Sequence, residues 1–171
     1  MHGRNPLMVL TILLVFLWAG HSWAGPIIKL AVVTKPGSAQ NVCADQFRRL
    51  LESRSGYKVR MYQGSSLGTE VEILKQIQTN AVQMGVITSA VFDAFLPDVR
   101  VLDYPFLFES YDQADRVLDG APGQELLRRL EKAGFKGLAY SENGFRDLTN
   151  DRCPVHNVQD AAGLKIRVME S

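Results

Sequence analysis

The apolar positions in the first part of the chain follow two different periods. Residues 27–33 (IIKLAVV) are almost all apolar, which is typical of a strand buried on both faces. Lys35–Gly37 contains a proline and a glycine and ends this strand. Apolar residues then recur at helical spacing, which predicts a helix from Ser38 to about Ser55. The residues of this apolar stripe are Cys43, Phe47, Leu50 and Leu51.

A second strand and helix follow in the same order. Residues 58–62 (KVRMY) alternate between polar and apolar, which predicts another strand. Thr69 and Glu72 have the spacing of a capping box and predict the start of a helix. Residues 84–87 (MGVI) predict a third strand. The apolar face expected for the helix consists of Ile73, Leu74, Ile77 and Ala81.

The next part of the chain is richer in helix signals. Residues 97–109 are expected to form a short strand and an aromatic loop interrupted by proline. One helix is predicted from Ser110 to Leu118 and another from Pro122 to Ala133, with Gly134 as its end. Residues 136–141 (KGLAYS) again look like a strand. Because strands and helices alternate, we expect an α/β fold with a mostly parallel sheet.

The composition of the chain changes at Asn143. Residues 143–171 are polar and rich in turns, with two short strand candidates at 146–149 and 165–168. We expect a first α/β domain over 25–142 and the beginning of a second domain over 143–171. The segment 143–171 is too short to enclose a core of its own. The chain is therefore expected to be a truncated form.

The first residues predict export. Leu7 to Trp18 is an almost unbroken apolar stretch, and the small residues Ser22 and Ala24 precede a cleavage position before Gly25. Residues 1–24 therefore have the layout of a secretory signal peptide, with an uncleaved membrane anchor as the alternative. No second apolar stretch is long enough to span a bilayer, so the mature chain is expected in the periplasm and not in the membrane.

Charge and cysteine content narrow the possible partners. With 19 basic and 18 acidic residues the chain is close to neutral, which argues against nucleic acid or an anionic membrane surface as partner. Cys43 and Cys153 are expected either to form a disulfide or, for Cys43 on its apolar stripe, to be buried as a free thiol. With His156 they show no metal-ligand spacing, so neither a metal nor another cofactor is expected.

One motif suggests hydrolytic chemistry. Gly64–Gly68 (GSSLG) matches the nucleophile elbow of hydrolases and stands between a predicted strand and a predicted helix. Ser66 would be the nucleophile and His156 the base of a secreted serine hydrolase. However, the preceding strand carries Lys58 and Arg60, whereas an elbow usually follows a central apolar strand. A simple Gly/Ser turn explains the motif better.

Two arginines near the end of the chain suggest anion binding. In residues 164–168 (LKIRV) strand alternation places Arg167 on the face opposite the apolar residues. A guanidinium on a rigid strand can bind a carboxylate through two parallel hydrogen bonds. Arg146, on another strand candidate, would supply a second positive charge. The simpler alternative is that both arginines lie on exposed strand surfaces.

Four sequence runs, taken together, carry a family resemblance. They are GSSLGTEVE (64–72), LDYPFLF (102–108), NGFRDLTN (143–150) and DAAGLKIRVM (160–169). In this order they resemble the solute-binding proteins of TRAP transporters, the tripartite ATP-independent periplasmic family with DctP among its members. The resemblance covers residues 27–171. It implies a two-lobed binding protein and not an enzyme, which closes on an organic acid anion and delivers it to the permease subunits in the membrane.

The resemblance also implies site residues. Arg167 would clamp the carboxylate of the ligand and Arg146 would assist it. Glu70, Thr88 and Ser89 would line the cleft, as would Val33 and Thr34. Members of that family are much longer than this chain. The resemblance therefore implies a nearly complete first lobe, without its return segment, and only the start of the second.

Overall fold

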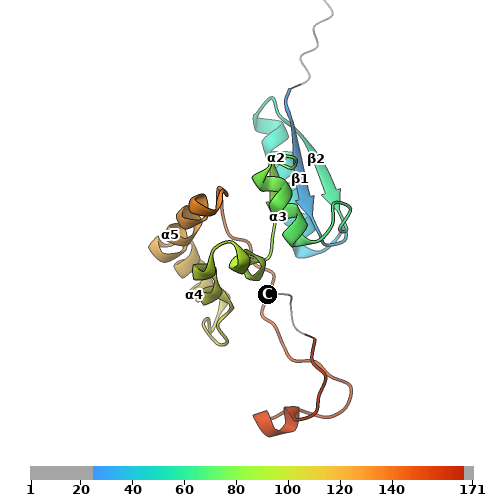
Figure 1. The fold of residues 1–171 in the computed structure, drawn as a ribbon, viewed down its shortest axis with the longest axis vertical. Coiled ribbons are helices and arrows are strands. Elements are labelled where there is room, and N and C mark those ends of the chain that lie inside the picture. Colours follow the sequence, from blue (N-terminus) through green and yellow to red (C-terminus); the bar gives the residue numbers. More distant parts are fainter. Residues whose placement is uncertain (1–24, 168–171) are drawn as a thin grey trace, which may run out of the picture.

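The centre of the structure is a small parallel sheet. The computed structural model describes residues 25–167 (Figure 1). Its strands are β1 (Ile27–Val32), β2 (Lys58–Gln63) and β3 (Met84–Val86), in the order β2-β1-β3. Both neighbours run parallel to β1. The expected α/β class and the three strands of the first part of the sequence are thus confirmed.

Each of the first two helices begins at a residue that caps it. The helix α2 (Ala39–Arg54) follows Ser38, whose side chain accepts a hydrogen bond from the backbone N–H of Asn41. The helix α3 (Glu70–Gln78) follows Thr69, and Thr69 and Glu72 form the predicted capping box in full. These local hydrogen bonds satisfy backbone donors that a helix leaves free in its first turn, so both starts agree with the sequence.

The two helices cover opposite faces of the sheet. Leu30 and Val32 of β1 pack with Ala44 of α2 in one buried cluster. Ala31, which points the other way, packs with Ile73 of α3 in a second cluster. All five side chains are at most 2 % exposed. The alternation along β1 therefore places it between two helical layers, as its unbroken apolar sequence predicts.

A helical subregion follows β3. Its elements are the 3₁₀ helices η1 (Ser89–Ala94) and η2 (Pro97–Asp103), the helices α4 (Tyr111–Leu118) and α5 (Ala121–Arg129), and the 3₁₀ helix η3 (Leu130–Ala133). All of these elements except α4 contribute to a third apolar cluster, which also includes Leu74 of α3 and Phe135. The rings of Phe92 and Phe95 meet Phe135 edge to face, with ring centroids 5.5 and 5.4 Å apart. This aromatic contact joins η1 to the end of η3.

Two strand predictions in this subregion are wrong. Within residues 97–109, the first seven residues form the 3₁₀ helix η2, because Pro97 stands at its first turn and Val99 packs into the third cluster. Residues 136–141 are not part of a sheet either. The hydroxyl of Tyr140 donates instead to the carbonyl of Gly123, at 2.9 Å, and so holds this segment against α5.

Residues 143–167 lie outside these layers. In this range the structure has one short 3₁₀ helix, η4 (Val158–Ala161), and otherwise turns and irregular backbone (Figure 1). The strands predicted at 146–149 and 165–168 are therefore not observed, with residue 168 outside the described part. In the described structure these residues have no neighbouring strand. Because a strand needs a partner for its backbone hydrogen bonds, their alternating sequence alone does not produce one. The predicted signal peptide, residues 1–24, also falls outside the described residues.

The expectations for the cysteines are wrong. Cys43 and Cys153 are both exposed, and they do not form a disulfide with one another. The buried side of α2 consists of Gln40, Asn41 and Ala44, with Phe47 of the predicted stripe packed against the same cluster. Polar side chains thus displace Cys43 from the interior.

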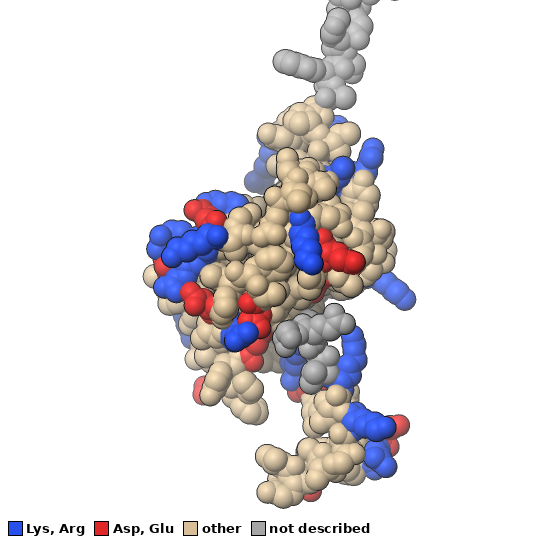
Figure 2. Space-filling model, viewed as in Figure 1, with Lys and Arg blue, Asp and Glu red and all other residues tan. Residues whose placement is uncertain are grey.

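Charged side chains of both signs are interspersed on the face of the molecule in Figure 2. Over α5, this mixture reflects ion pairs. Arg129 contacts Glu125 at 2.9 Å and Asp98 at 2.7 Å, and Arg128 also pairs with Glu125. Such exposed pairs contribute little to stability. They leave no broad surface of one sign on this face.

Candidate functional site

The strand order predicts where a ligand would bind. From the central strand β1 the chain crosses through α2 to β2 on one side and then through α3 to β3 on the other. The connections that follow β1 and β3 therefore lead away in opposite directions. Ligands of α/β proteins bind at such a switch point, beyond the carboxyl ends of the strands. Thr34 and Thr88 stand just after β1 and β3 at this edge.

Side chains at the start of α2 form hydrogen bonds with residues at the ends of all three strands. The Ser38 hydroxyl donates to Oγ1 of Thr34, at 2.6 Å, after β1. Nε2 of Gln40 lies 3.4 Å from Oγ1 of Thr88, after β3. In the other direction, Oδ1 of Asn41 accepts from Nε2 of Gln63, at 2.9 Å, in β2. We name these residues, together with Glu70, the carboxyl-edge network.

Glu70 enters this network from α3. Its Oε1 accepts hydrogen bonds from both the backbone N–H and the hydroxyl of Thr88, at 2.9 and 3.1 Å. Glu70 is the first residue of α3, so the start of this helix is joined directly to the end of β3. Because Gln40 and Glu70 both contact Thr88, this residue is held from the helices on both faces of the sheet.

The contacts continue from Thr88 to Asp103. The adjacent Ser89 has its hydroxyl 3.5 Å from Oδ1 of Asp103, the last residue of η2. Partial burial raises the pKa of Asp103, and the charge of the Arg146 guanidinium and the Ser89 hydrogen bond oppose that rise. Arg146 thus acts on the Asp103 pKa through its charge and not through a direct hydrogen bond.

Aromatic packing holds the segment that carries Arg146. The rings of Tyr111, at the start of α4, and Phe145 are in contact, with centroids 4.8 Å apart. Gly144 has φ of +93°, a backbone conformation that favours glycine. A Cβ added there would lie 3.6 Å from the Tyr111 hydroxyl. The sequence Asn143–Arg146 thus needs its glycine for backbone shape and its phenylalanine for docking on α4.

The predicted site residues are brought together only in part. Thr34, Glu70, Thr88 and Ser89 belong to a series of hydrogen bonds at the carboxyl edge of the sheet, whereas Arg146 acts on Asp103 only through its charge. The half-buried Val33 also lies at this edge, where its carbonyl accepts from the hydroxyl of Ser65 at 3.3 Å. Arg167 is exposed near the end of the described chain and is not on an observed strand.

Sequence reasoning missed Gln40, Asn41 and Asp103. Gln40 and Asn41 are only 6 % and 4 % exposed, although both are polar residues in a first helical turn. An adjacent pair of amide side chains in the first turn after an N-cap serine was the available signal. Asp103 lies within residues 97–109, which were predicted as a short strand and a loop, and this concealed its place at the end of a 3₁₀ helix.

The hydrolase alternative is not supported by the geometry. In a nucleophile elbow the nucleophile itself occupies a strained turn. Here the residue with positive φ is Ser65, at 60°, and not Ser66. Moreover β2 is an edge strand of the observed sheet. His156 lies in the loop before η4, and its backbone N–H donates to Asp160.

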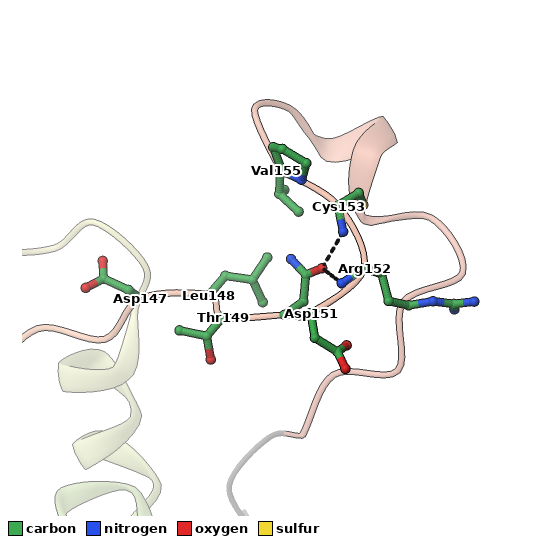
Figure 3. A pocket seen from close by; sticks show the side chains of 9 residues that line it. Asp147, Leu148, Thr149, Asp151, Arg152, Cys153 and Val155 are labelled. Atoms are coloured by element: carbon green, nitrogen blue, oxygen red, sulfur yellow. Dashed lines mark hydrogen bonds between the residues drawn. The ribbon is translucent and has the colours of Figure 1, made fainter.

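A second hollow lies on the segment beyond Arg146. It is open and lined by residues 147–155, as Figure 3 shows. Oδ1 of Asn150 accepts from the backbone N–H groups of Arg152 and Cys153, at 2.9 and 3.0 Å, and shapes this turn. A single stretch of chain forms the whole hollow. We therefore place the candidate site at the carboxyl edge of the sheet, where the ends of β1, β2 and β3 meet the starts of α2 and α3.

Comparison with known proteins identifies the family. The model of the bacterial extracellular solute-binding proteins, family 7, also called DctP, matches residues 30–171. The chain belongs to this family. A solute-binding protein of Verminephrobacter eiseniae is 38 % identical over 84 % of this chain and 44 % of its own length. The 2,3-diketo-L-gulonate-binding periplasmic protein YiaO of Escherichia coli is 35 % identical, over 88 % and 46 %.

Solved structures of family 7 agree with the fold. A TRAP periplasmic solute-binding protein from Polaromonas sp. JS666, bound to D-erythronate, matches with a TM-score of 0.80 and 36 % identity. The match covers 85 % of this chain and 49 % of that protein. The family 7 chain thus spans about half the length of the relatives it matches. They are binding proteins and not enzymes, which confirms the expectation drawn from the sequence resemblance.

Within residues 25–167, no helix of the family 7 chain has the length and apolar character needed to cross a bilayer.

Proposed function

We propose that this chain contributes one wall of an organic-acid site in a periplasmic solute-binding protein. The observation that carries the proposal is the carboxyl-edge network, a set of polar side chains at the switch point of a parallel sheet, where α/β proteins bind ligands. Arg146, whose charge acts on the pKa of Asp103, would bind a carboxylate there through two charge-assisted hydrogen bonds. The ligands named for YiaO and for the Polaromonas protein are both organic acids.

Arg167 is proposed as the principal clamp on the same carboxylate. It would act from the domain that begins at residue 143, whereas residues 25–142 form the first lobe. The ligand would contact both lobes only when they close, so binding would favour the closed state. In that state the two arginines of the second lobe would bind the acid, and the carboxyl-edge network of the first lobe would lie on its other side.

Export and delivery complete the proposal. Residues 1–24 would be removed as a signal peptide, and the mature protein would act in the periplasm. Its partner would be the membrane permease of a TRAP-type transporter. N-terminal sequencing of the exported chain tests the first step, because cleavage before Gly25 yields a single defined start. An intact leader on the exported product would contradict it.

Binding is tested on the chain 25–171 with D-gluconate and succinate as probes. We expect Arg146→Ala and Arg167→Ala each to weaken binding by about 2–5 kcal/mol, because a desolvated carboxylate loses its partner. Arg167→Lys is expected to recover part of this loss, since lysine lacks the bidentate geometry. NMR titration of the ¹⁵N-labelled chain provides the measurement.

Arg54→Ala is the matched control. Arg54 is exposed at the last turn of α2, at the end of the helix opposite the carboxyl-edge network. This variant removes one positive charge and is expected to bind both probes as the unmodified chain does. If the Arg146 and Arg167 variants kept unchanged affinity as well, the carboxylate clamp would be refuted.

A further inference from the structure

The strand β2 forms one border of the sheet. It pairs with β1 on one side, and within residues 25–167 no strand pairs with its other side, which we name the outer edge of β2 (Figure 1). The backbone N–H of Lys58 donates to the carbonyl of Pro26 at 3.1 Å, so Lys58 turns its backbone towards β1. Because this direction alternates along a strand, the backbone groups of Val59 and Met61 point to the outer edge. Such a row of groups is a template for a strand of another chain.

A carboxylate from α2 occupies the beginning of this outer edge. Oε1 of Glu52 accepts a hydrogen bond from the backbone N–H of Val59 at 2.9 Å. The Glu52 side chain is half-buried, with 23 % of its surface exposed. Its oxygen therefore stands where the carbonyl of a neighbouring strand would otherwise accept from Val59.

The Glu52 carboxylate is held in place by its own helix. Arg48, one turn earlier on α2, donates to Oε2 of Glu52 at 3.1 Å and also pairs with Asp45 at 2.7 Å. The two oxygens of Glu52 thus have separate partners, one on the strand and one on the helix. The hydrogen bond from Val59 is the main cause that lowers the pKa of Glu52, and the charges of Arg48 and Lys58 lower it further, whereas burial opposes them. The group is accordingly ionised at neutral pH.

The two faces of β2 differ in their tendency to pair. Val59 and Met61 pack partly buried against the apolar cluster beneath α2. Lys58 and Arg60 alternate with them and are exposed. A second copy of β2 at the outer edge would extend the apolar face, but it would also bring like charges together on the other face. Charged side chains of this kind oppose pairing at an edge strand.

From these contacts we propose that Glu52 covers the outer edge of β2 and thereby keeps the chain from pairing with a second copy of itself. The carboxylate occupies the N–H of Val59, and Lys58 and Arg60 add electrostatic repulsion. Without the carboxylate, the β2 strands of two copies pair through the backbone groups of Val59 and Met61. This role is independent of ligand binding at the carboxyl-edge network.

Glu52→Ala in the chain 25–171 tests this role. Alanine cannot accept a hydrogen bond and keeps the helix. We expect sedimentation equilibrium to give a self-association constant about ten-fold or more above that of the unmodified chain, because the N–H of Val59 becomes available to a second strand.

Amide hydrogen exchange locates the contact. At low protein concentration, where Glu52→Ala is monomeric, the amide of Val59 should exchange about ten-fold faster than in the unmodified chain. As the concentration is raised, the amide of Met61 should become protected, because it then donates to the second copy. A merely destabilised fold would instead expose both amides at every concentration.

Two further variants serve as controls. Glu52→Gln keeps an oxygen that can accept from Val59 and should remain as monomeric as the unmodified chain. Asp45→Ala removes another carboxylate that pairs with Arg48 and leaves Glu52 in place. If Asp45→Ala associated as strongly as Glu52→Ala, loss of charge on α2 and not the uncovered edge would be the cause, and the proposal would be overturned.

The remaining outcomes are equally decisive. If Glu52→Ala exchanges faster at Val59 but stays monomeric, the outer edge needs no cover and the proposal fails. If it associates without protecting Met61, the contact lies elsewhere and the proposal fails as well. Should circular dichroism show that Glu52→Ala has lost its fold, Glu52→Leu, which retains an aliphatic side chain in this half-buried place, is measured in the same two ways.

Discussion

Residues 25–142 and residues 143–167 contrast sharply in how they are held. The first region surrounds a parallel sheet with three buried apolar clusters, and its helices start at capping residues. The second has one 3₁₀ helix, and none of its described apolar side chains belongs to these three clusters. The difference shows that hydrophobic content alone does not make a core. Layers that can cover it are also needed.

The contact between the two regions is confined to a few groups. Phe145 packs on Tyr111, and the charge of Arg146 acts on the pKa of Asp103. At the end of the first region, Glu142 lies near Asp115 of α4. Burial raises the pKa of Glu142, and so do the carboxylates of Asp115 and Asp112. The second region is therefore anchored at its beginning, at the point where the candidate site also lies.

The largest difference between the regions is expected from leucine truncation. Leu74 is fully buried between α3 and the helical subregion, so Leu74→Ala should lower the free energy of unfolding by about 2–5 kcal/mol. Leu148→Ala should change it by no more than about 0.5 kcal/mol. Urea unfolding followed by circular dichroism measures both. Equal losses would show that residues 143–167 possess a core of their own.

A smaller effect is expected at the anchor itself. Tyr111→Ala removes the ring that Phe145 contacts, which should cost about 0.5–1.5 kcal/mol of local stability. Amide hydrogen exchange at 143–147 should accelerate several-fold, with the exchange of β1 unchanged. Tyr111→Phe keeps the ring and should resemble the unmodified chain. If exchange were equally fast in both variants, the hydroxyl and not the stacking would hold the segment.

The smallest effect concerns pH and one capping group. Hydrogen bonds from the backbone and side chain of Thr69 lower the pKa of Glu72 below its ordinary value of 4.5. A carboxyl group with a lowered folded-state pKa stabilises the fold above its unfolded pKa and loses this contribution as pH falls through the folded value. Stability should therefore decline slightly below about pH 4.5 through this group.

Glu72→Gln isolates that contribution. Glutamine can also complete a capping box but does not titrate. The difference in unfolding free energy between the two proteins should shrink as pH is lowered from neutrality through the acidic range. A difference that stayed constant with pH would mean that Glu72 does not act through its charge.

The sequence predicted most of the first region because the relevant signals are local. The capping box at Thr69, the N-cap at Ser38 and the apolar run of β1 each involve a few neighbouring residues, and all three are observed. The prediction of a strand at 136–141 was wrong, because strand formation depends on a partner that is distant in the sequence. Cys43 was misplaced because Gln40 and Asn41 are buried through hydrogen bonds, which an apolar pattern does not reveal.

The candidate site was predictable to a similar degree. The resemblance pointed to Glu70, Thr88, Ser89 and Thr34, which the strand order brings to one edge. Neither periodicity nor motif indicated that Glu70 is bound to Thr88, since the two are 18 residues apart. The predicted importance of Arg167 depends on a strand that does not form among the described residues, so its role stays a prediction.

The order β2-β1-β3 also affects how the sheet can assemble. The middle strand is the first to be synthesised, and Lys29 meets Gln83 across 54 residues of chain. No hairpin can start such a sheet, since both neighbours of β1 reach it through crossovers. Helical turns can form early, whereas the ladders must wait for these long loops to close, which slows folding. Until residues 84–86 are available, one side of the most apolar strand has no backbone partner.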